Sequence, residues 1–341
     1  MTTPITILTG FLGSGKTTLL NHALRGPWLS RALVVVNEFG EVPLDHLLVK
    51  EVREDVLLLA SGCVCCSVRG DLVEALLAEA ARGAPTRFDR VFVETTGLAD
   101  PTPIVATLVR HPELTRFFHL DAVVTAIDAE HGATSLRRHE EAAKQVALAD
   151  DLVFTKLDKV DAELLASTRE RVAALNPRAR VFLAERGVLD WRPLLEWTPS
   201  TVASRLDVAA HAPHQGETIW SFTVRADRDV DFRSFALWLS IVSQFHGETL
   251  LRVKGLLRVE NEPGPVVVQA VQHVVYPTYS MARWPSEDRS SRLVVITRGM
   301  GTALFEGLRL SLEEMLGVKP QRESGATHEA GPVETPTRFS A

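Results

Sequence analysis

Short apolar runs alternate with helical stretches over the first 200 residues of the chain. Most runs are continuous stretches of Val, Ile and Leu, as expected for strands that are buried on both faces of a parallel sheet. The pattern therefore predicts an α/β domain over residues 1–200, with a mostly parallel sheet between layers of helices. The predicted strands are residues 5–8, 32–37, 56–59, 90–94, 122–128, 151–155 and 180–184.

The pattern changes after residue 200. Residues 201–216 have no sustained period and contain Pro213, so they are predicted to form a linker. Strands are then predicted at 218–224, 250–259, 266–271 and 292–297, with helices at 232–243 and 303–316. This order predicts a small α+β domain with an antiparallel sheet over residues 217–317. Residues 318–341 are polar and rich in Pro, Gly, Thr and Glu, and we expect a disordered tail there.

The composition narrows the class of protein. The 341 residues include 37 Lys and Arg against 43 Asp and Glu, and the net charge of −6 excludes a strongly basic nucleic-acid-binding protein. No stretch approaches the roughly 18 apolar residues of a membrane helix. Residues 1–8 lack the basic segment of a signal peptide. We therefore predict a cytoplasmic protein without nucleic acid or membrane among its partners, and a homo-oligomer is left open.

A glycine-rich motif directly follows the first predicted strand. Residues 10–17, G-F-L-G-S-G-K-T, fit the phosphate-binding pattern G-x-x-x-x-G-K-[ST] and lead into a helix. The backbone N–H groups of such a loop surround phosphate oxygens, Lys16 would reach the β and γ phosphates, and Thr17 would bind Mg²⁺. A ligand-free glycine turn would not require the Lys-Thr pair. The predicted phosphate contacts are Gly13, Ser14, Gly15, Lys16, Thr17 and Thr18.

A second acidic element is expected at the end of a neighbouring strand. Glu94 closes the run V-F-V-E and is followed by T-T-G. We predict that Glu94 helps to hold Mg²⁺, through water, and that Gly97 lets the backbone approach the γ-phosphate as a switch. Lys16, Thr17 and Glu94 are the predicted catalytic residues. Without the phosphate loop, a carboxylate at the end of a strand would be a weak signal.

The segment T-K-L-D at residues 155–158 would select the base. Asp158 can accept hydrogen bonds from the guanine N1 and N2 groups, and the stem of Lys156 would cover the ring. The usual guanine signature begins with Asn, whereas Thr155 occupies that position here. We expect this replacement to remove an amide that braces the loop, which weakens the case for GTP over ATP. A surface Lys-Asp pair is the alternative.

All three cysteines lie within four positions of one another, at Cys63, Cys65 and Cys66. In a reducing compartment, thiols this close together are more often metal ligands than disulfide partners. Thiolates favour Zn²⁺ or Cu⁺, and a tetrahedral Zn²⁺ site needs a fourth ligand or keeps an open position. The candidates for that ligand are Glu38, Glu41 and His46. Buried inert thiols and a redox pair are the alternatives.

With these elements assembled, the chain resembles the CobW-type metallochaperone GTPase family, a branch of the SIMIBI P-loop GTPases that includes zinc chaperones, cobalamin-biosynthesis proteins and nitrile hydratase activators. The similarity spans about residues 4–317. The matching segments are residues 10–18, 37–41, 62–66, 94–101 and 155–158, with 252–255 and Trp284-Pro285 in the C-terminal part.

The resemblance implies a P-loop NTPase domain followed by the family's C-terminal domain at 217–317. It also implies that the cysteine motif, with Glu41 as a candidate ligand, binds a transferred metal between the switch segments. Thr155 departs from the family pattern, and His211 and His214 stand where some members carry a His-rich tract. A metal-storage tract is therefore not supported.

We interpret the chain as a GTPase metallochaperone that uses GTP, Mg²⁺ and Zn²⁺, with Co²⁺ or another transition metal as alternatives, and that delivers the metal to a client protein. No residue has the character of an arginine finger, so we expect slow intrinsic turnover. One competing interpretation is a small-molecule P-loop kinase with structural cysteines, which would leave a phosphorylated acceptor. Another is a nucleotide-regulated adaptor whose metal is structural and cannot be removed without unfolding.

Overall fold

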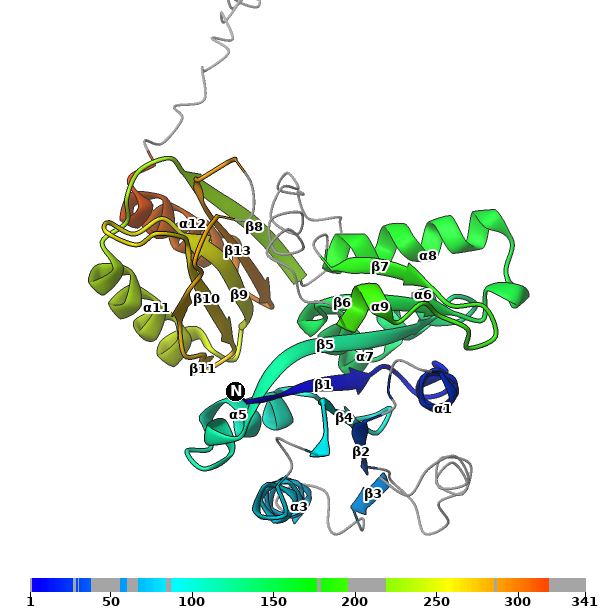
Figure 1. Cartoon of the computed structure of the whole chain (residues 1–341). Helices are drawn as coiled ribbons and strands as arrows, with labels where there is room; N and C mark the ends of the chain where they lie inside the picture. The colour runs from blue at the N-terminus through cyan, green and yellow to red at the C-terminus, as the bar shows by residue number, and fades with distance from the viewer. Residues whose placement is uncertain are drawn as a thin grey trace, which may run out of the picture.

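The computed structural model describes residues 2–26, 29, 31–37, 56–59, 67–83, 87–176, 179–195, 219–284 and 287–318. These residues form two sheets, one in each half of the chain (Figure 1). The expected linker at 201–216 and, apart from Val318, the expected tail at 318–341 lie outside the described residues. No helix within the described ranges is long and apolar enough to cross a membrane.

The N-terminal sheet has seven strands in the order β3-β2-β4-β1-β5-β6-β7, and every neighbouring pair is parallel. This confirms the predicted parallel α/β fold. Since all strands run the same way, their carboxyl ends meet at one edge, where ligands bind in open α/β sheets. The strands are β1 (Thr3–Thr9), β2 (Ala32–Asn37), β3 (Val56–Leu59), β4 (Arg90–Glu94), β5 (Phe118–Asp128), β6 (Asp151–Thr155) and β7 (Arg180–Leu183).

Helices cover both faces of this sheet, so successive residues of a strand enter different cores. Ile5 and Ile7 of β1 pack in the core that contains α3 and α5, whereas Leu8 packs in the core that contains α1 and α9. This double burial explains why the strands are apolar throughout. The helices are α1 (Lys16–Arg25), α3 (Ser67–Ala81), α5 (Thr102–Arg110), α6 (Gly132–Arg138), α7 (Glu140–Leu148), α8 (Ala162–Leu175) and α9 (Arg192–Leu195).

The C-terminal sheet is antiparallel, as predicted, with the order β11-β10-β9-β13-β8 and β12 paired to β10. Its helices α11 and α12 pack together on one face of the sheet (Figure 1). Val318, the first residue of the expected tail, still packs against this core. The elements are β8 (Ile219–Ala226), α11 (Phe232–His246), β9 (Leu250–Leu257), β10 (Val266–Val271), β11 (Val274–Val275), β12 (Tyr279–Ser280), β13 (Ser291–Arg298) and α12 (Thr302–Leu316).

The other face of the C-terminal sheet packs against the N-terminal half. One apolar core joins Val146 of α7 and Phe154 of β6 to Leu251 of β9 and Ile296 of β13. A buried ion pair lies beside it, in which Asp150 accepts hydrogen bonds from Arg252 and from the ammonium group of Lys254. Both cations belong to the R-V-K-G segment that contributed to the family resemblance.

Candidate nucleotide-binding site

The phosphate loop joins β1 to α1 at the carboxyl edge of the parallel sheet. Gly10 has φ 141° and Gly15 has φ 85°, a region of φ that L side chains rarely adopt. A Cβ at Gly10 would also overlap the carbonyl oxygen of Ala126 on β5. Gly15 precedes the first residue of α1, so the N–H groups of the helix end open into the loop. The glycines of the motif are therefore needed by the backbone of the loop.

Lys16 is the first residue of α1, and its side chain lies inside the loop. Its ammonium group donates a hydrogen bond to the carbonyl of Gly10 at 2.8 Å and lies 3.4 Å from the carbonyl of Phe11. The residue is 9% exposed. A buried cation enclosed by backbone amides provides the charge that binding a polyphosphate requires.

The next residue of the helix meets the acidic strand end. The hydroxyl of Thr17 donates a hydrogen bond to Oε1 of Glu94 at 2.8 Å. Register explains the meeting, because Glu94 of β4 is paired with Leu8 of β1, the strand that leads into the loop. The Thr17 and Glu94 oxygens are hard ligands of the kind that Mg²⁺ prefers, so the donor set fits this ion. All three predicted catalytic residues thus gather at one end of β1.

Gly97 lies against the phosphate loop. A Cβ at this position would come within 2.7 Å of the backbone nitrogen and Cα of Leu12. The contact needs a residue without a side chain, as expected for a backbone that must approach the phosphates. Gln145 on α7 holds this segment in place, since its side-chain amide donates to the carbonyls of Gly97 at 3.1 Å and Ala99 at 3.0 Å. No sequence pattern pointed to Gln145, which lies in an ordinary amphipathic helix.

Thr155 contacts the phosphate loop through its hydroxyl group. Its hydroxyl lies 2.8 Å from the carbonyl oxygen of Ser14 and 3.1 Å from that of Ile127, and the residue is 4% exposed. The hydroxyl of Thr155 therefore braces the loop at the position where the usual guanine signature has an amide. A hydroxyl group is long enough here because the loop passes close to Thr155 at Gly15, where an added Cβ would lie 3.6 Å from the Thr155 side chain.

The two charged residues of the base segment have different surroundings. Lys156 has a left-handed backbone, with φ 56°, and its ammonium group donates to Oδ2 of Asp128 at 2.7 Å. Burial alone would raise the pKa of Asp128, but hydrogen bonds from Lys156 and from two backbone N–H groups hold it below the usual range. Asp158 is exposed at the same edge of the sheet. Its carboxylate is therefore accessible to a ligand.

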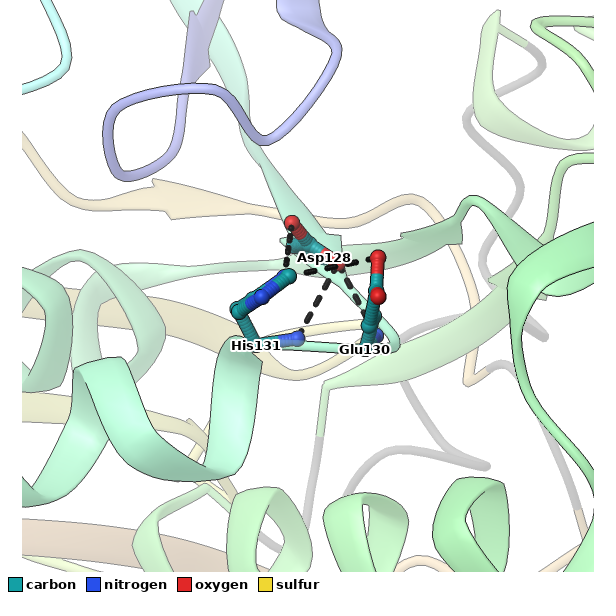
Figure 2. Close-up of side chains that lie close together, drawn as sticks. All are labelled: Asp128, Glu130 and His131. Carbon is teal, nitrogen blue, oxygen red and sulfur yellow. Dashed lines mark hydrogen bonds and ion pairs between the residues drawn. The ribbon is translucent and has the colours of Figure 1, made fainter.

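Asp128, Glu130 and His131 bring three metal-binding side chains together (Figure 2). The carboxylate of Asp128 is already engaged. Its Oδ1 accepts from the backbone N–H groups of Glu130 and His131 at 2.9 and 3.2 Å, and its Oδ2 accepts from Lys156. The side chain of His131 is 65% exposed. We interpret the cluster as a turn that begins α6, not as a metal centre.

The predicted ligands of the transferred metal follow β2 and β3 in the sequence. Cys63, Cys65, Cys66 and Glu41, together with the alternative ligands Glu38 and His46, lie outside the described residues. The strands that precede them are described, and Asn37 at the end of β2 is paired with Leu59 at the end of β3. Both strands therefore end at the edge of the sheet that carries the phosphate loop.

Comparison with known proteins agrees with this geometry. Residues 4–183 match the CobW/HypB/UreG nucleotide-binding domain, and residues 219–316 match the cobalamin synthesis protein cobW C-terminal domain. The chain is 33% identical over 317 residues to the zinc chaperone YjiA of Escherichia coli, covering 89% of this chain and 98% of that protein. It is 31% identical over 345 residues to the zinc chaperone CobW of Pseudomonas aeruginosa, covering 91% of each.

Solved structures give the same result. The crystal structure of the Zn(II)-bound YjiA GTPase from Escherichia coli matches with a TM-score of 0.65 at 26% identity, covering 92% of this chain and 99% of that one. The fold and the phosphate loop define a P-loop GTPase. The chain belongs to the CobW family, with both the nucleotide-binding and the C-terminal domains, as the sequence resemblance indicated.

Proposed function

We infer that this protein is a metallochaperone that binds Zn²⁺ at Cys63, Cys65 and Cys66 and delivers it to a client protein under the control of GTP. The relatives that match most of its length are zinc chaperones by name. The observation that carries the nucleotide half of the proposal is the hydrogen bond between Thr17 and Glu94, next to the buried ammonium group of Lys16.

Each residue of the site has a distinct role in the proposed hydrolysis. Lys16 neutralises charge on the β and γ phosphates, and the N–H groups of the loop orient their oxygens. Thr17 and Glu94 would hold Mg²⁺, which supplies charge neutralisation on the phosphates when it is bound. Gly97 lets its segment approach the γ-phosphate. Because Gly97 already lies against Leu12 of the loop, a change at the phosphates reaches this segment directly.

Asp158 and Lys156 are proposed to read guanine. Asp158→Asn should weaken GTP binding and improve binding of xanthosine triphosphate. Xanthine has a keto group where guanine has its exocyclic amine, and the amide introduced at position 158 can donate a hydrogen bond to that keto group. Competition titrations with the two nucleotides and ATP measure this change. Equal losses of GTP and ATP would show that the segment does not read the base.

The metal half of the proposal depends on the chemistry of the cysteines and on the position of their strand. Strand β2, which ends at Asn37, lies next to β4, the strand that ends at Glu94, and β3, which ends at Leu59, lies next to β2. A nucleotide-dependent movement at this edge can therefore reach the metal ligands. Glu41 is proposed as the further ligand.

Cytoplasmic location, the division into domains at 1–200 and 217–317, and any homo-oligomer remain predictions.

Calorimetric titration of each ligand in the presence and absence of the other tests the proposal. If GTP raises the affinity for Zn²⁺ by some factor, Zn²⁺ must raise the affinity for GTP by the same factor. Cys65→Ala should weaken Zn²⁺ binding and abolish both effects, while Mg²⁺·GTP binding is retained because Lys16, Thr17 and Glu94 are unchanged. Independent affinities in the natural protein would leave a metal-binding GTPase without the proposed switch.

A further inference from the structure

Helix α7 contacts the nucleotide site and the C-terminal sheet at the same time. Its residues 140–148 contact β5 of the parallel sheet and β9 of the C-terminal sheet. The hydroxyl of Thr125 on β5 donates to the backbone carbonyl of Gln145 at 2.9 Å, which fixes the middle of the helix on the parallel sheet. The two ends of α7 are held by other parts of the structure.

One side of α7 holds the loop segments around the phosphates. Besides the two hydrogen bonds from Gln145 to Gly97 and Ala99, Lys144 forms an ion pair with Asp100 at 3.3 Å. His139, just before the helix, stacks on Phe11 of the phosphate loop with 4.4 Å between ring centroids. Gln145 is 1% exposed, so solvent cannot replace its hydrogen bonds in this state.

A second set of contacts joins α7 to the C-terminal domain. Glu140 at its first turn forms an ion pair with Arg298, the last residue of β13. The carbonyl of Leu148 at its last turn accepts a hydrogen bond from Arg252 of β9. Between these ends, Ala143 and Val146 pack in the core shared with the C-terminal sheet. A shift of α7 therefore displaces contacts at both ends of that interface.

Gln145 is also incompletely satisfied. Its Oε1 atom is buried and has no hydrogen-bond partner among the described residues. A buried acceptor without a partner costs free energy, and such groups are few in folded proteins. The side-chain amide of Gln145 thus donates two hydrogen bonds to the segment 97–99 while its own oxygen stays without a partner among the described residues. A second arrangement of the segment that supplies an N–H to Oε1 would remove this cost.

We propose that Gln145 is a positioning residue for the switch segment 97–99, and that α7 couples the state of this segment to the C-terminal domain. The inference rests on the proposed role of Gly97 at the γ-phosphate. Gln145 acts through the two carbonyls that it holds, and not through a contact of its own with nucleotide or metal. A client protein bound to the C-terminal domain would change hydrolysis through the same helix.

The test compares triphosphate with diphosphate binding. Gln145→Met keeps the size of the side chain and removes the donor. We expect the affinity for a non-hydrolysable GTP analogue to fall about tenfold, since two hydrogen bonds that fix the segment are lost, while GDP affinity stays within about twofold. The turnover number for GTP hydrolysis should fall together with the affinity for the GTP analogue. Gln244→Met, on the exposed face of α11, is the matched control and should change neither affinity.

A purely structural role would weaken both nucleotides equally or lower only the melting temperature, and either result would overturn the proposal. Arg298→Ala covers the case in which Gln145→Met fails to fold, because this variant breaks the ion pair to Glu140 from the C-terminal side. It should change the ratio of triphosphate to diphosphate affinity in the same direction by about threefold. An unchanged ratio in Arg298→Ala contradicts coupling through α7.

Gly97→Ala separates this inference from the proposed function. If Gly97→Ala leaves the ratio of triphosphate to diphosphate affinity unchanged, the segment does not sense the γ-phosphate and the switch in the proposed function fails. If Gly97→Ala changes the ratio and Gln145→Met does not, the switch stands and the role of Gln145 is wrong.

Discussion

The two ends of β6 carry aspartates in opposite situations. At the amino end, Asp150 is buried with Arg252 and Lys254, and Asp151 is fully buried with Arg180, whose nitrogens lie 2.7 and 2.9 Å from its two oxygens. Beyond the carboxyl end, Asp158 is exposed. A buried carboxylate with cationic partners joins parts of the protein, whereas an exposed carboxylate at the ligand edge is available to a nucleotide. One short strand thus connects a structural site to a predicted binding site.

Removing the ion pairs of Asp150, at the amino end of β6, should have the largest effect on stability. Asp150→Ala removes the carboxylate that pairs with the buried Arg252 and the partly buried Lys254, and it is expected to lower the free energy of unfolding by about 3–5 kcal/mol. Urea denaturation measures the change. As a control, Asp190→Ala removes an exposed partner of Arg192 and should leave the free energy of unfolding nearly unchanged, because solvent screens such surface pairs. Similar losses in the two variants would show that the buried cluster does not hold the domains together.

The carboxyl end should respond in the opposite way. Asp158→Ala is expected to weaken GTP binding by about tenfold or more, because hydrogen bonds to a charged acceptor are worth about 1.5–3 kcal/mol. Its free energy of unfolding without nucleotide should change by less than about 0.5 kcal/mol, as for other exposed positions. Fluorescence titration and urea denaturation measure the two quantities. A large loss of stability with unchanged affinity would reverse the assignment of the two ends.

Thr155, between these ends, should show a smaller effect of both kinds. Thr155→Val keeps the shape of the side chain but removes the hydroxyl that braces Ser14, and it should cost about 1 kcal/mol of stability. GTP affinity should fall modestly because the loop is less well held. Thr115→Val is the control, since that exposed hydroxyl bonds only to its own turn. No difference between the variants would mean that the brace contributes nothing.

The smallest effect is expected from pH. The pKa of Asp128 is lowered in the folded state, so its contribution to stability is complete above the unfolded value of 3.8 and is lost as pH falls through the lower folded value. The natural protein should therefore exceed Asp128→Asn in stability near neutral pH, and the difference should shrink below pH 3.8. Urea midpoints across this range provide the measurement. A difference that grows in acid would contradict the assigned hydrogen bonds.

Much of the parallel sheet could be predicted from the sequence because its strands are buried on both faces and leave a strong apolar signal. The N-terminal part of β5 shows the limit. This strand begins at Phe118, before the predicted residue 122, because Asp121 is neutralised by Arg90 and a polar residue can therefore lie within a strand. The strands β11 and β12 were missed, since two-residue strands have no period of their own.

The candidate site divides in the same way. Two short motifs contain Lys16 and Thr17 in one case and Asp158 in the other. The spacing within each motif is set by the backbone of its own loop, so these residues can be found without a structure. Gln145 acts across the fold on a carbonyl 48 positions away in the chain, and Thr155 bonds to a carbonyl 141 positions away. Such contacts depend on how helices and strands pack, and no local pattern of residues encodes them.

The core shared by α7, β6, β9 and β13 has a consequence for how the chain can be divided. The two halves share this core: Val146 of α7 lies in it with Leu251 of β9 and Ile296 of β13, so separating the halves would remove apolar contacts from both. A chain cut between β7 and β8 is therefore expected to remain together as a noncovalent complex. Either half produced by itself is expected to aggregate, and a shuffled gene that joins this GTPase half to another partner would need a replacement sheet of the same shape.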